Sequence, residues 1–139
     1  VFPGIDRTLC VLAGEAITLA FEGRASVLLD RASAPYSFAA DLAVSGEVAG
    51  AGITDLNVMS RRGVARHHVS RMLLEGATAI ALPGTALMVL SLEAGLSIHA
   101  GAEQLDLAKG DAALITGPDG NLTLEAARPT EIFLIDLWT

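Results

Sequence analysis

The chain is poor in aromatic and basic residues. Aromatic residues make up 4% of the 139 residues, Lys109 is the single lysine, and the formal net charge at pH 7 is -7. Binding to nucleic-acid phosphates requires clustered Lys and Arg side chains. The nearest approach to such a cluster is Arg61, Arg62 and Arg66, which stand among apolar residues without a neighbouring aromatic. The composition therefore argues against a nucleic-acid partner.

Cysteine and long apolar runs are also scarce. Cys10 is the single cysteine, which excludes an internal disulfide framework and a multi-cysteine zinc site. Its place within LCVLAG favours burial as a small hydrophobe, and the expected compartment is the reducing cytoplasm. The most apolar tract, residues 77–98, is broken by Pro83 and Gly84 before it reaches the roughly 20 residues of a membrane span. No membrane partner is expected.

Short apolar or alternating segments recur along the whole chain, with Gly, Asp, Pro or Ser between them. A recurrence of roughly 8–12 residues is typical of an antiparallel sandwich or barrel. Helix is the weaker interpretation, because no stretch keeps a helical stripe for three turns without Gly or Pro. The predicted strands span residues 8–13, 16–21, 25–30, 36–40, 43–49, 53–61, 64–74, 77–81, 86–92, 95–99, 103–107, 112–116, 121–126 and 131–138.

An internal repeat divides the sequence into two parts. Residues 11–41 and 91–111 each contain a strand, a small-residue turn, a returning strand, a second turn, an apolar strand and a closing aspartate. Two copies of one unit predict two barrels. The expected domains span residues 1–75 and 76–139, and exchange of strands between the barrels is an alternative that would move this boundary.

Three motifs carry a resemblance to a known family. They are FPGIDR at residues 2–7, FAAD at 38–41 and TDLNVMSRRG at 54–63. Together they resemble the HutD/Ves family, whose pattern includes Phe-Pro-Gly-x-x-Arg and Asp-aromatic-Asn-aliphatic-Met-Ser/Thr-Arg. The resemblance covers essentially the whole chain. It departs from the family pattern at Leu56, where an aromatic residue is commoner, and in lacking the N-terminal Trp-x-Asn-Gly-Gly-Gly segment.

The second half of the chain also looks like a cupin, with a Gly-Asp turn at Gly110 and a Pro-x-Gly turn at Pro118. The resemblance implies an all-β bicupin, that is, two packed antiparallel β-barrels of the RmlC-like jelly-roll type. It also implies an association with histidine-utilisation operons, as an accessory or regulatory protein rather than a pathway enzyme.

The usual metal ligands of cupins are missing from the sequence. Most metal-dependent cupins present a His-x-His pair, then a Glu and a further His, whereas the second repeat offers His99 alone. His67 and His68 are adjacent, so on a strand they face opposite ways. No nucleophile elbow or triad-like order is present. The sequence predicts no metal, no cofactor and no catalytic residue, with a metal-independent enzyme using Asp55 as proton acceptor as an alternative.

The candidate ligand site lies on one face of the expected strand at 53–61. The residues that share this face by alternation are Asp55, Asn57, Met59 and Arg61. In a barrel such a face lines an interior that holds a small ligand. A buried Arg61 needs a partner, because an unpaired buried charge is costly. Either Asp55 or a ligand carboxylate would supply it.

The FPGIDR segment adds Arg7 as a second anion contact and Phe2 at the rim of the site. Intermediates of histidine breakdown, including urocanate, formiminoglutamate and N-formylglutamate, carry carboxylates that would suit such a site. The expected function is a non-catalytic cytoplasmic protein that binds a small carboxylated metabolite and modulates expression of the pathway. One alternative is a satisfied polar network that ties strands together. Another is an interaction module, homodimer included, that pairs through the edge of residues 64–74.

Overall fold

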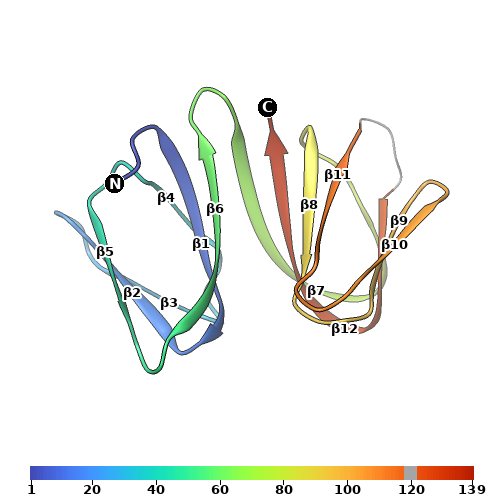
Figure 1. Cartoon of the computed structure of the whole chain (residues 1–139), viewed down its shortest axis with the longest axis horizontal. Coiled ribbons are helices and arrows are strands. Elements are labelled where there is room, and N and C mark those ends of the chain that lie inside the picture. The colour runs from blue at the N-terminus through green and yellow to red at the C-terminus, as the bar shows by residue number, and fades with distance from the viewer. Residues whose placement is uncertain (118–121) are drawn as a thin grey trace. The chain divides into compact units, whose positions relative to one another are not determined.

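The structure, a computed structural model, describes residues 1–117 and 122–139, and the elements it forms there are all β-strands (Figure 1). Every strand pair with a defined register is antiparallel, so the predicted all-β antiparallel class is confirmed. The chain divides into two compact units, Val1–Arg66 and His67–Thr139. No helix that could cross a membrane occurs within the described ranges.

Unit 1 consists of two three-stranded sheets. In the first, β1 (Ile5–Gly14) lies between β4 (Tyr36–Ala39) and β6 (Ile53–Arg61). In the second, β2 (Ala16–Phe21) lies between β3 (Val27–Asp30) and β5 (Val44–Val48). Alternation turns every second side chain of these strands toward a shared apolar core. Its buried members are Leu9, Val11, Leu19, Phe21 and Leu29.

Three of the few aromatic residues meet in unit 1. The ring centroid of Phe21 lies 5.3 Å from that of Phe38 in an edge-to-face arrangement, and 6.2 Å from that of Tyr36. Tilted and edge-to-face pairs of this kind add to the free energy of burial. The aromatic cluster of Phe21, Tyr36 and Phe38 thereby ties β4 of the first sheet to β2 of the second.

Unit 2 is organised around one long strand. The sheet order is β10 (Glu103–Leu107), β9 (Leu96–Ala100), β12 (Leu122–Trp138), β8 (Ala86–Ser91) and β11 (Ala112–Thr116), and β7 (Arg66–Ile80) also pairs with β12. The first part of β12 pairs with β9, and its later part pairs with β8. Its inward side chains therefore contribute to the core along most of its length. The buried core residues are Leu74, Leu87, Val89, Leu96, Ile98, Leu107, Ala113, Leu122, Leu124, Ala126, Ile132 and Leu134.

Two predicted interruptions are absent from unit 2. The strands expected at 64–74 and 77–81 form the single strand β7, which runs through Gly76 with φ +67°. The strands expected at 121–126 and 131–138 form β12, which runs through the exposed Pro129. Gly and Pro usually interrupt strands, and here both are accommodated within long ones. The expected Pro118 turn and residue 121 lie outside the described residues.

The boundary between the units also differs from the expected one. Residues 75 and 76 lie inside β7, whereas the contacts of the chain divide after Arg66. The small residues around Gly76 resemble a linker in the sequence, yet they belong to the interior of a strand. The division instead follows the turn between β6 and β7, where the N–H groups of Val64 and Ala65 donate to the carbonyl of Arg61.

Gly14 offers a test of the close approach between β1 and β6. It has φ +92°, and a Cβ there would lie 2.8 Å from the Cα of Ile53 and overlap the carbonyl of Gly52. Gly23 has φ +71° with open space around it. We expect Gly23→Ala to cost about 1–2 kcal/mol through backbone strain, and Gly14→Ala to cost roughly 1–3 kcal/mol more through overlap. Urea unfolding of both variants measures the difference, and equal losses would contradict the described approach.

Candidate functional site

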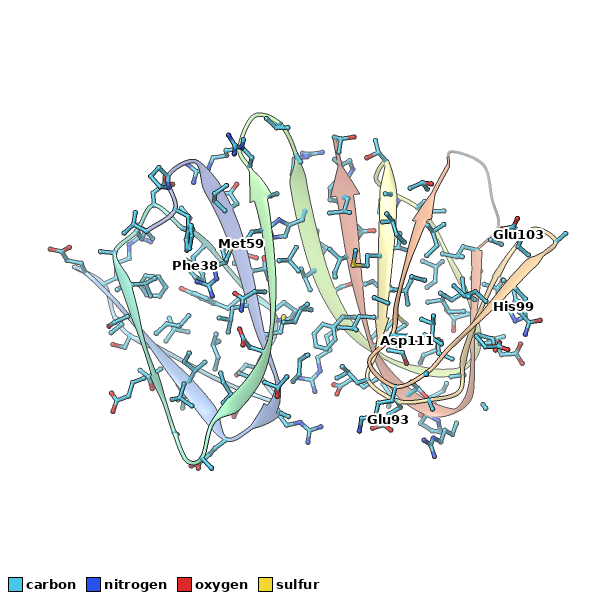
Figure 2. The ribbon with its side chains drawn as sticks, viewed as in Figure 1. Phe38, Met59, Glu93, His99, Glu103 and Asp111 are labelled. Atoms are coloured by element: carbon cyan, nitrogen blue, oxygen red, sulfur yellow. The ribbon has the colours of Figure 1, made fainter. Side chains whose placement is uncertain are left out.

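The candidate site lies on the core-facing side of the sheet formed by β4, β1 and β6. Arg7 of β1 is directly opposite Phe38 of β4 and Met59 of β6, and directly opposite residues of an antiparallel pair share a face. The next residue of β1 on that face, Leu9, is 2% exposed and belongs to the core of unit 1. Figure 2 labels Phe38 and Met59 on this part of the unit. Pairing thus brings Arg7 and the polar residues of β6 together.

Arg7 is held in place by its neighbours. Its Nε donates to the Oδ1 of Asn57 at 2.6 Å, and the amide nitrogen of Asn57 donates in turn to the carboxylate of Asp55. The guanidinium carbon of Arg7 lies 5.6 Å from the ring centroid of Phe38, within the range of a cation–π contact. Among the described residues, no hydrogen-bond partner engages either Nη group of Arg7. A carboxylate could therefore accept from these donors.

The site is open to solvent rather than enclosed. Asn57 is exposed, Met59 is 44% exposed, and Phe2 is 52% exposed. Arg61 is exposed as well, although the alternation of residues 53–61 predicts that it lines an enclosed hollow. It occupies the last position of β6, opposite Ile5, where the sheet gives way to the turn. Asp55 is bound by Asn57, so the structure shows Arg7, not Arg61, connected to the acid of this face.

Arg62 has a central role that the sequence motifs did not predict. Its Nε donates to Asp6 at 2.9 Å, and its Nη2 donates to the carboxylate of Asp41 and to the carbonyl of Ile5. The other oxygen of Asp41 accepts from the backbone N–H of Gly4 at 2.6 Å. We call this set of contacts the Arg62 clamp. It joins the three sequence motifs at one point, so part of their shared pattern has a structural explanation.

Charge reinforces the Arg62 clamp. The hydrogen bond from Arg62, together with that from the N–H of Gly4, holds the pKa of Asp41 below its usual value. Hydrogen bonds to Asp41 and Asp6 raise the pKa of Arg62. The sequence does contain a signal for this pairing. Residue 62 lies one position beyond Arg61 and residue 6 one position before Arg7, so alternation assigns both to the face opposite the candidate site.

A second polar cluster lies on unit 2, on the outward face of β9, β10 and β12. Asp106 accepts from Ser97 at 2.7 Å and from Gln104 at 3.0 Å, and these bonds lower the pKa of Asp106. The Nε2 of His99 lies 3.3 Å from a carboxylate oxygen of Glu125, close enough for an ion pair but outside hydrogen-bond geometry. Within residues 1–117 and 122–139, no group of three His, Cys, Asp or Glu side chains could hold a metal ion.

The comparisons with known proteins agree with the motifs. A sequence model of the HutD family matches residues 1–134. The chain belongs to the HutD family. No curated protein matches the chain.

Solved structures share the fold at low sequence identity. A conserved protein of unknown function from Pseudomonas aeruginosa PAO1, PA5104, is 23% identical, with a TM-score of 0.89 over 99% of this chain and 72% of that chain. HutD from Pseudomonas fluorescens SBW25 is 20% identical, with a TM-score of 0.70 over 99% and 70% of the two chains. YhaK from Escherichia coli is 16% identical, with a TM-score of 0.72 over 100% and 78%. These likenesses establish the fold.

The adjacent arginines of this HutD-family chain provide a matched pair for testing the Arg62 clamp. We expect Arg62→Ala to lower the midpoint of thermal unfolding and to speed hydrogen exchange at the N–H of Gly4, because Asp41 loses its charged partner. Arg61→Ala removes the same charge from a side chain that forms no ion pair with the described residues, so its midpoint should stay close to that of the parent. Calorimetry and exchange measured by NMR check both effects. Equal midpoints for the two variants would contradict the clamp.

Asp41 gives stability a pH dependence of defined sign. The pKa of Asp41 is lowered in the folded state. The contribution of the ionised carboxylate to the free energy of unfolding is therefore complete above the unfolded pKa near 3.8, and it is lost as the pH falls through the folded pKa. Asp41→Asn should therefore flatten the dependence of the unfolding midpoint on pH between about pH 5 and pH 2. The exposed Glu75 serves as control. An equal flattening in Glu75→Gln would point to general charge instead of the clamp.

Proposed function

We propose that this HutD-family protein binds a small carboxylated metabolite at Arg7 and serves histidine utilisation as a non-catalytic accessory protein. The observation that carries the proposal is the guanidinium of Arg7, which is oriented by Asn57 and Phe38 while its Nη groups keep free hydrogen-bonding capacity. A prearranged guanidinium loses less conformational freedom on binding than a mobile one. Two parallel N–H donors match the geometry of a carboxylate.

The surroundings of Arg7 favour an anion with an apolar or planar part. Phe38 and Met59 flank Arg7 on the two neighbouring strands, so they would contact the carbon skeleton of a bound acid. Asp55 would repel a carboxylate, but this carboxylate accepts from Asn57, and Asn57 is the residue that Arg7 contacts directly. Arg61 lies on the same face, one pleat beyond Met59, and would provide a second positive charge. Phe2 would complete the rim.

The family supports the metabolic context. HutD-family membership points to histidine utilisation, in which several intermediates are carboxylates. In the same proposal, units 1 and 2 are the two barrels of a bicupin, and the protein modulates pathway expression in response to the bound acid.

Calorimetric titration with urocanate and N-formylglutamate tests the binding. We expect Arg7→Gln to weaken binding by at least tenfold, since hydrogen bonds to charged groups contribute about 1.5–3 kcal/mol. Arg61→Ala should weaken it less, because this side chain is exposed. Arg24→Gln removes an exposed arginine elsewhere in unit 1 and serves as the matched control.

Two results would contradict binding at Arg7. One is the absence of binding of either acid by the intact protein. The other is an affinity that stays unchanged in Arg7→Gln while the variant keeps the thermal unfolding midpoint of the parent. Chromatography of the acids after prolonged incubation should detect no product, and a product would favour an enzyme that uses Asp55 instead.

A further inference from the structure

Unit 2 contains a cavity that the proposed function does not use. Its volume is about 570 Å³, which lies within the range typical of small-molecule sites, about 300–1,000 Å³. It opens between β10 and β11, the two end strands of the sheet order of this unit. Its apolar lining consists of Ile98, Ala100, Leu105, Ala113, Leu114 and Ile115.

The wall of this cavity differs from an ordinary protein surface. Ile98 and Ala113 are 4% and 7% exposed and belong to the core of unit 2, so the cavity reaches the core. At its mouth, Leu105 is 52% exposed. Binding of a ligand that removes this exposed leucine from water is favoured by roughly 25 cal/mol per Å² of apolar area buried.

Small side chains keep the space open. Ala113 and Ala100 contribute one methyl group each, whereas the neighbouring inward positions of the same strands carry Ile115 and Ile98. A larger residue at position 113 would extend into the cavity. The volume therefore follows directly from the amino-acid sequence of β9 and β11.

The charge at the cavity is negative. Glu103 lines it and is directly opposite Ala100, and alternation puts Glu103 on the same face as the buried Leu107. The described part of the chain provides no ion-pair partner for Glu103, and no lysine or arginine lines the cavity. Figure 2 labels Glu103 beside the β9–β10 connection, away from Glu93 and Asp111. Gln104 donates to Asp106 on the outward face. The carboxylate of Glu103 is therefore the charged group of the site.

We infer that this cavity is a second ligand site, which takes a small apolar molecule bearing one amine group. The carbon skeleton contacts Ile98, Ala113 and Leu105, and the ammonium group pairs with the carboxylate of Glu103. A carboxylated molecule of the same size is disfavoured by the like charge. This preference is opposite to that proposed for Arg7, so the two sites select different chemical classes.

Titration of the whole chain with hexylamine, hexanol and hexanoate tests the inference, with NMR signals of the Ala100 and Ala113 methyl groups as the readout. Hexylamine should shift these signals at the lowest concentration and hexanoate should leave them unchanged. Glu103→Gln should weaken hexylamine binding by roughly fivefold and leave hexanol binding unchanged. Glu75→Gln, which removes an exposed acid outside the cavity, should change neither.

Two further variants test the apolar wall. Ala113→Leu should abolish binding of hexylamine and hexanol by filling the cavity. Because this variant also risks misfolding, Leu105→Gln at the exposed mouth provides a second test and should weaken hexylamine binding severalfold. Leu73→Gln is its control, since Leu73 is 61% exposed on β7 and does not line the cavity.

Three outcomes would overturn the inference. The first is equal binding of hexylamine and hexanoate, and the second is binding that neither Glu103→Gln nor Leu105→Gln alters. The third is concentration-dependent association in light scattering that Leu105→Gln abolishes, because a second copy of the chain would then cover the cavity. Binding of urocanate at Arg7 is measured separately, so failure of either site is distinguishable from failure of the other.

Discussion

The antiparallel pairing of β1 with β6 is the constraint on which unit 1 depends. It sets Arg7 opposite Met59 and Asp6 opposite Ser60. Because successive residues of a strand face opposite sides, the same ladder serves two purposes. One face holds the Arg7 site, and the other directs Asp6 toward Arg62. A shift of the register by one residue would exchange these faces and dismantle both arrangements together.

The adjacent arginines that end β6 illustrate this division. They are identical in side-chain chemistry and both are exposed, yet Arg61 lies beside the candidate site while Arg62 binds two aspartates and a carbonyl. Family motifs that end in two arginines therefore combine a structural requirement with a proposed functional one. Position relative to the sheet, not residue type, separates the two roles.

Much of the fold was predictable because alternation is a local signal. The bounds predicted at 16–21, 53–61, 103–107 and 112–116 agree with β2, β6, β10 and β11. Prediction failed where Gly76 and Pro129 continue a strand, since the pairing that tolerates them involves residues distant in sequence. The alternation of β6 grouped Asp55, Asn57 and Met59 on one face, as the structure has them. It did not reveal the bond from Arg7 to Asn57 or the bond from Arg62 to Asp41, because these contacts also join residues distant in sequence.

The position of β12 in the sequence has a consequence for biogenesis. This strand pairs with β7, β8 and β9, and all three precede it in the chain. During synthesis on the ribosome, those strands emerge with apolar faces and unsatisfied edges before their common partner exists. Unit 1 has no such dependence on β12 for its own sheets, so it is able to assemble early. Chaperones would then be most useful during the period in which β7, β8 and β9 have emerged and β12 has not.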